Sequence, residues 1–86
     1  MDLDEPMYRY FGTTELSAVA PDLMASGRKG MVSEFSLISD RRRRFATWAL
    51  MHVLGIAPDA DSAFDHAADR KAARDFVGML ASVNDN

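Results

Sequence analysis

The stretch from Asp40 to Pro58 reads DRRRRFATWALMHVLGIAP, and it decides the fold. Large, mostly apolar side chains recur in it at helical spacing: Phe45, Trp48, Ala49, His52, Val53 and Ile56. The other side is also apolar, with Ala46, Leu50, Met51 and Leu54. Ser39 or Asp40 suits the N-cap, and Gly55 followed by Pro58 is a typical helix end. This pattern predicts a central helix that is buried on all sides.

A second helical stretch follows and has one apolar stripe. The stripe comprises Phe64, Ala68, Ala72, Phe76, Met79, Leu80 and Val83. Ser62 or Asp65 is a possible N-cap, so we expect a helix from Ser62 or His66 to about Ser82. Gly78 lies inside this helix, where glycine costs about 1 kcal/mol relative to alanine. We therefore expect Gly78 to lie in close backbone contact with the central helix.

The first forty residues give a weaker helical pattern. Asp4 to Gly12 is consistent with a short helix that has Pro6 in its first turn. Glu15 to about Ser26 predicts a second helix, kinked or divided by Pro21 and ended by Gly27. Residues 28–40 are open to three interpretations: a loop, an isolated extended piece, or an early start of the central helix. A lone strand without a partner would be unstable, so no sheet is predicted.

These elements together predict an all-α fold. We expect a small orthogonal bundle of three main helices plus a short N-terminal helix. The chain of 86 residues is long enough for one domain and one core, so residues 1–86 are assigned to a single domain. Residues 1–3 and 84–86 lack a sustained apolar pattern, and fraying is expected there.

Composition excludes several classes of protein. The chain has no cysteine, which rules out disulfides, zinc–thiolate sites and thiol nucleophiles and favours a cytoplasmic protein. Its acidic start does not resemble a secretory signal. The longest nearly apolar run, Phe45 to Ala57, is shorter than the roughly 20 residues that span a bilayer. No membrane association is therefore expected.

The run Arg41-Arg42-Arg43-Arg44 is the most unusual feature of the sequence. Residues 28–44 contain six basic and two acidic residues, a net charge of +4, between two acidic flanks. Consecutive helical residues point about 100° apart, so the four arginines encircle the first turn of the central helix. They are either solvated side chains, some paired with the acidic flanks, or a contact for carboxylates or phosphates.

An aromatic segment near the N-terminus is a second candidate for partner binding. Tyr8, Tyr10 and Phe11 either fold back to complete the core or serve as an anchor for another chain.

The sequence offers no catalytic or metal site. His52 has only apolar neighbours on adjacent turns, which is typical of a core histidine. Asp59, Asp61 and Asp65 lack the glycine and the third ligand of a calcium loop, and they suit a helix start instead. No catalytic residue, metal ligand or cofactor is therefore assigned.

These observations favour a non-enzymatic protein–protein interaction module, a small accessory or regulatory protein. Its partner is expected to be another protein or its own copy, with a homodimer as the favoured assembly. Candidate dimer surfaces are residues 8–11 and the outer side of the central helix, at Leu50, Met51 and Leu54. The alternative is a nucleic-acid-binding regulator that uses Arg41–Arg44 at a helix N-terminus. The pI near 5.1 and the acidic flanks count against that alternative.

Overall fold

The computed structural model describes residues 3–84, which form helices and no strand. In chain order the elements are α1 (Asp4–Phe11), the 3-10 turn η1 (Leu16–Ala18), α2 (Pro21–Glu34), the 3-10 turn η2 (Phe35–Leu37), α3 (Arg41–Val53), α4 (Ala60–Ala63) and α5 (Ala67–Asn84). The predicted all-α class is confirmed. None of the described helices is long and apolar enough to cross a bilayer.

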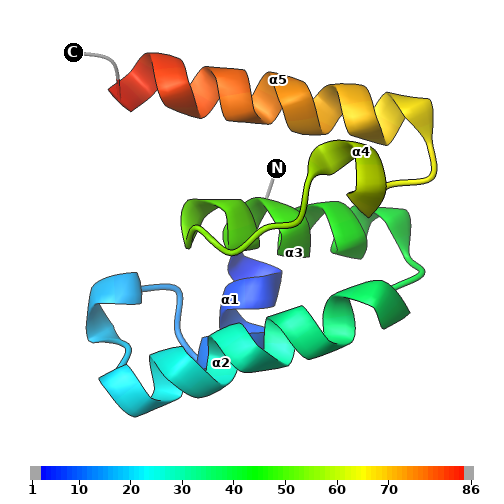
Figure 1. The fold of residues 1–86 in the computed structure, drawn as a ribbon. Coiled ribbons are helices and arrows are strands. Elements are labelled where there is room, and N and C mark those ends of the chain that lie inside the picture. The colour runs from blue at the N-terminus through cyan, green and yellow to red at the C-terminus, as the bar shows by residue number, and fades with distance from the viewer. Residues whose placement is uncertain (1–2, 85–86) are drawn as a thin grey trace.

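The three long helices lie in one layer, with α3 between α2 and α5 (Figure 1). α1 lies crosswise to α2 and α3 and packs on both. The result is a flat molecule with principal extents of 37 × 35 × 19 Å. This arrangement agrees with the predicted bundle of three main helices and one short N-terminal helix.

α3 is the predicted central helix, with the predicted ends. The Asp40 carboxylate accepts a hydrogen bond from the backbone N–H of Arg43 at 2.9 Å, as an N-cap does. At the other end Gly55 adopts a left-handed φ of 77°, and the N–H groups of Gly55 and Ile56 bond to the carbonyls of His52 and Met51. This is the Schellman arrangement that a glycine permits.

The core is built around Trp48, which is 2% exposed. Its indole N–H donates to the Pro58 carbonyl at 2.9 Å, so the polar end of the side chain is satisfied. Its ring meets Phe64 and Phe76 edge to face, at centroid distances of 5.6 and 6.4 Å. These ring contacts join α3 to the end of α4 and to α5.

The predicted division of the second helical stretch at Pro21 is confirmed, but the two parts differ in length from the prediction. Residues 16–18 form only a 3-10 turn, and α2 begins at Pro21, whose missing N–H costs nothing in a first turn. α2 then continues through Gly27, which was predicted to end it, as far as Glu34. A Cβ at Gly27 would lie 2.9 Å from the Tyr10 carbonyl oxygen and still closer to the Phe11 ring. Gly27 is therefore a close-approach residue between α1 and α2, and residues 28–34 continue the preceding helix.

Of the two predicted starts of the last helix, the one near His66 is confirmed, because α5 begins at Ala67, whereas the start at Ser62 and the contact expected for Gly78 are wrong. The chain leaves the helical path at Phe64, whose extended backbone directs a buried ring into the core, and this divides the stretch into α4 and α5. Gly78 makes no close contact, because a Cβ there would meet nothing within 4 Å.

The side of α3 that was predicted to face outward is covered by the rest of the chain. Leu50 and Met51 are 1% and 2% exposed, and Leu54 is half-buried. Leu50 and Met51 are therefore excluded as a dimer surface.

The two ends of the described chain are ordered parts of the fold. Leu3 packs against the core and precedes α1, and the backbone of Asn84 belongs to α5. The other four residues for which fraying was predicted lie outside the described range.

Candidate partner-binding groove

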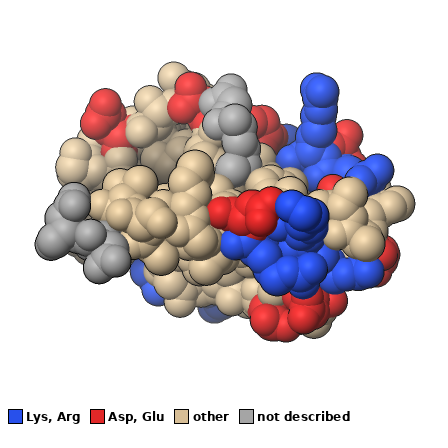
Figure 2. Space-filling model, turned by 90° about the horizontal axis from the view of Figure 1, so that it is seen from above, with Lys and Arg blue, Asp and Glu red and all other residues tan. Residues whose placement is uncertain are grey.

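The four arginines of the run have four different environments, as their 100° separation implies. Figure 2 shows basic and acidic side chains mixed along one edge of the molecule. Arg41 reaches α5 and forms a bidentate pair with Asp69, with Nε–Oδ2 and Nη2–Oδ1 distances of 2.9 and 3.0 Å. These hydrogen bonds hold the pKa of the Asp69 carboxyl below its usual value. Part of the basic block is thus neutralised by the C-terminal acidic flank.

Arg44 is a structural residue. Its guanidinium donates to the carbonyls of Ala63, Phe35 and Ile38 at 2.8, 2.9 and 3.0 Å. It also lies 4.3 Å from the centroid of the Phe35 ring, in a cation–π contact. Arg44 therefore holds the segment before α3 against the end of α4, and it has little left to offer a partner.

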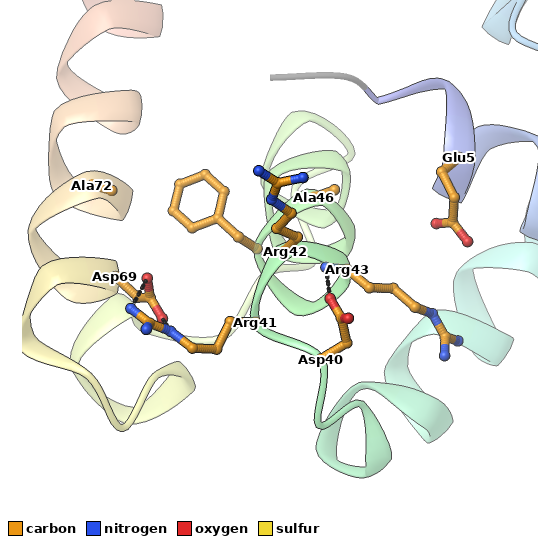
Figure 3. A pocket seen from close by; sticks show the side chains of 9 residues that line it. Glu5, Asp40, Arg41, Arg42, Arg43, Ala46, Asp69 and Ala72 are labelled. Atoms are coloured by element: carbon orange, nitrogen blue, oxygen red, sulfur yellow. Dashed lines mark hydrogen bonds and ion pairs between the residues drawn. The ribbon is translucent and has the colours of Figure 1, made fainter.

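Arg43 extends from α3 toward α1 and α2 (Figure 3). Its Nε is buried and has no hydrogen-bond partner among residues 3–84. The Tyr10 hydroxyl lies close to Arg43 and Glu34 without a hydrogen bond of good geometry to either. Burial raises the pKa of Tyr10, Glu34 raises it further, and Arg43 opposes both effects. Arg43 is thus placed beside one of the predicted aromatic residues.

Arg42 is the arginine of the run without a partner in the described chain. It is exposed and projects over α3 between α5 and α1 (Figure 3). No hydrogen bond or ion pair joins it to any residue from 3 to 84.

Arg42 stands in an open groove of about 1120 Å³. α3 forms the floor, α5 one wall and α1 the other (Figure 3). The groove is lined by Glu5, Asp40, Arg41, Arg42, Arg43, Phe45, Ala46, Asp69 and Ala72. Its apolar part comprises the half-buried ring of Phe45 and the two alanines. The site therefore combines a cationic group with an apolar floor.

The three acidic residues of the groove are already engaged. Glu5 bonds to Arg9 within α1 at 2.6 Å. Asp40 caps α3, and Asp69 pairs with Arg41. None of these three carboxylates is therefore hydrogen-bonded or ion-paired to Arg42, although Asp40 keeps its negative charge at the N-terminus of α3.

The predicted aromatic residues do not form one surface. Tyr8 is 61% exposed, Tyr10 is half-buried, and Phe11 is 7% exposed and belongs to the core cluster. None of them lines the groove. Of the predicted site residues, the groove brings together Arg41, Arg42 and Arg43, whereas Arg44 faces the other way, into the η2–α4 contact.

The residues that sequence reasoning missed are Phe45, Ala46, Glu5, Asp69 and Ala72. Phe45 lies three residues after Arg42, and this helical spacing is the signal that could have placed Arg42 and Phe45 on a common face of α3. His52 stacks on Trp48 at a centroid distance of 5.5 Å and meets Phe76 edge to face, as a core histidine does. Within residues 3–84, no group of three or more metal-ligating side chains is arranged to hold an ion.

Comparison with known proteins adds no relative. No protein-family model, no curated protein and no solved structure matches the chain.

Proposed function

We propose that this protein is a non-enzymatic helical interaction module that binds a partner protein in the groove between α1 and α5. The observation that carries this proposal is Arg42, an arginine without a partner among residues 3–84 that stands over an apolar floor in an open groove. Protein interfaces favour this combination, since arginine and aromatic residues are enriched at their centres. A cytoplasmic, accessory or regulatory role is part of the same proposal.

The distribution of charge favours a protein over a nucleic acid. Arg41 is neutralised by Asp69, and the donors of Arg44 are directed to backbone carbonyls. Phosphate binding by the run therefore depends on Arg42 and Arg43, and each phosphate contact contributes only a small part of nucleic-acid affinity. We expect no shift of duplex DNA or RNA in a mobility titration at near-physiological salt. Micromolar binding that Arg41–Arg44 alanine substitutions abolish would instead support the regulator hypothesis.

Affinity purification from the native cell, with and without nuclease, tests the proposal directly. We expect a protein partner that survives nuclease, is lost with Arg42→Glu and is retained with Lys29→Glu, an equal charge change on the exposed side of α2. The captured protein is then purified and its binding to the same variants is titrated. A partner whose affinity is unaffected by Arg42→Glu contradicts the proposed site.

Self-association is proposed at a different surface from the one the sequence indicated. Met79 and Val83 on the last turns of α5 are 56% and 65% exposed, and residues 76–84 contain no charged side chain. An uncharged, partly apolar face suits an identical face of a second copy, because closed twofold dimers use the same patch twice. Light scattering should report a dimer that Met79→Glu dissociates. Val32→Glu is the matched control, because Val32 is 58% exposed on α2.

A further inference from the structure

We infer that the occupant of the groove is an acidic amphipathic helix of another protein, whose apolar face lies on Phe45 and whose carboxylate meets Arg42. This inference rests on the proposed function and names the chemistry of the partner.

The shape of the groove supports a helical occupant. α1 and α5 both pack on α3 and form opposite walls, so the space between them is open above α3 (Figure 3). A helix about 10 Å across with a 5.4 Å pitch occupies roughly 400 Å³ per turn. The open groove of about 1120 Å³ is larger than one such turn, so one face of a helix can enter it. A helix placed there buries one face and leaves the other in solvent, as amphipathic helices do when they bind grooves.

The charges of the groove select an acidic helix. Two of the three acidic lining residues, Glu5 and Asp69, are in ion pairs and Asp40 caps α3, whereas Arg42 has no partner and Arg43 has no ion pair in the described range. A carboxylate that enters the groove can pair with Arg42 in a bidentate fork without displacing an existing bond. A basic helix would instead bring like charge against two arginines, which opposes binding.

The apolar floor determines the spacing that the apolar side chains of the partner helix need. Phe45 and Ala46 follow the arginines by one helical turn, and Ala72 faces them from α5. A partner with apolar residues at i and i+4 and an acidic residue beside them matches this layout. The last turns of α5 from a second copy do not, because residues 76–84 carry no acidic side chain to meet Arg42.

Two synthetic peptides test the inference. One is a sixteen-residue amphipathic helix of leucine, alanine and glutamate, and the other is the same peptide with lysine at every glutamate. Fluorescence anisotropy with the full chain should show binding of the acidic peptide, weaker at high salt, and no binding of the basic one. Arg42→Glu should lower the affinity for the acidic peptide about tenfold or more, which corresponds to the loss of one good charge pair.

Two further variants separate the groove from general electrostatics. Lys29→Glu changes the net charge equally and should leave the affinity within about twofold. Ala72→Phe leaves the charge unchanged but fills the groove, and it should abolish binding of the acidic peptide. Both substitutions are at exposed positions, and thermal melts verify that the variants fold.

The outcomes distinguish this inference from the proposed function. The inference is overturned if the acidic peptide does not bind, if the basic peptide binds as well, or if Arg42→Glu has no effect. If the native partner nevertheless depends on Arg42, the groove is a protein-binding site and only the chemistry of the occupant is wrong. If neither the peptides nor the native partner respond to Arg42, both proposals fail.

Discussion

The two sides of α3 are held in different ways. On one side α1 and α2 approach so closely that Gly27 has no room for a Cβ, and its neighbours are the Tyr10 carbonyl and the Phe11 ring. On the other side α5 is joined through the contacts of the Phe76 ring and the Arg41–Asp69 pair, and a Cβ at Gly78 would meet nothing within 4 Å. Two glycines inside helices therefore have opposite meanings: one is required by packing, and the other lacks a packing role in the described chain.

The largest expected effect comes from removing the aromatic attachment of α5. Trp48→Ala removes contacts with both Phe64 and Phe76 and leaves a cavity, which should cost about 3–5 kcal/mol of unfolding free energy. Chemical denaturation followed by circular dichroism measures the loss. Unchanged melting would show that α5 is held by something other than these rings.

The arginine run provides the next comparison. Arg44→Ala leaves the carbonyls of Phe35, Ile38 and Ala63 without their guanidinium donor, and we expect a loss of about 2–3 kcal/mol. Arg42→Ala, two residues earlier, should change stability by less than about 0.5 kcal/mol because Arg42 has no partner in the described chain. Equal effects of the two substitutions in urea unfolding would contradict the different roles assigned to them.

The close contact of α1 and α2 is tested by adding a single methyl group. Gly27→Ala forces the Phe11 ring and the Tyr10 backbone away from α2 and should cost about 1–3 kcal/mol. Gly30→Ala is the control, because its Cβ would lie 3.6 Å from the Tyr10 ring, an ordinary contact. A Gly27→Ala variant as stable as Gly30→Ala would indicate that α1 is less tightly held than its geometry implies.

The same substitution on α5 should have the opposite sign. Gly78→Ala meets no obstacle and improves helix propensity, so the free energy of unfolding should rise by about 0.5–1 kcal/mol. Thermal melts at low protein concentration measure this effect on the monomer. A loss of stability there would mean that a methyl group at Gly78 meets a neighbour within the monomer.

The smallest effect concerns the pair that links α3 to α5 at the surface. The hydrogen bonds from Arg41 lower the pKa of Asp69 in the folded chain below its unfolded value of about 3.9. The pair therefore stabilises the fold above that pH, and its contribution is lost as the pH falls through the folded-state pKa. Asp69→Asn should remove this part of the acid dependence, and the effect should be small because Arg41 is half-exposed. Identical acid unfolding curves for the two proteins would contradict the assignment.

The sequence predicted best where a local signal has one physical meaning. Asp40 and Gly55 mark the ends of α3 because a carboxylate at an N-cap and a glycine after a last turn each have a specific role. Gly27 was misread as a helix end because a glycine that ends a helix and one that admits a neighbouring helix look the same along the chain. The two cases differ only in the presence of α1, whose residues Tyr10 and Phe11 lie outside the stretch of sequence around Gly27.

The candidate site was only half accessible to sequence reasoning. The 100° turn between residues predicts that Arg41 to Arg44 face different directions, but it does not tell which one is free. That depends on acceptors far along the chain, namely Asp69 for Arg41 and the Ala63 carbonyl for Arg44. The groove itself combines α1, α3 and α5, so its walls become visible only when the helices are placed in space.

The contacts of Arg44 and Arg41 also have a consequence for synthesis of the chain on the ribosome. The acceptors at Ala63 and Asp69 follow these arginines by 19 and 28 residues. Because a chain emerges from its N-terminus, the whole cationic run leaves the ribosome before either acceptor does. In the nascent protein Arg41 therefore lacks its carboxylate, and Arg44 one of its three carbonyl acceptors, until the chain as far as the start of α5 has emerged.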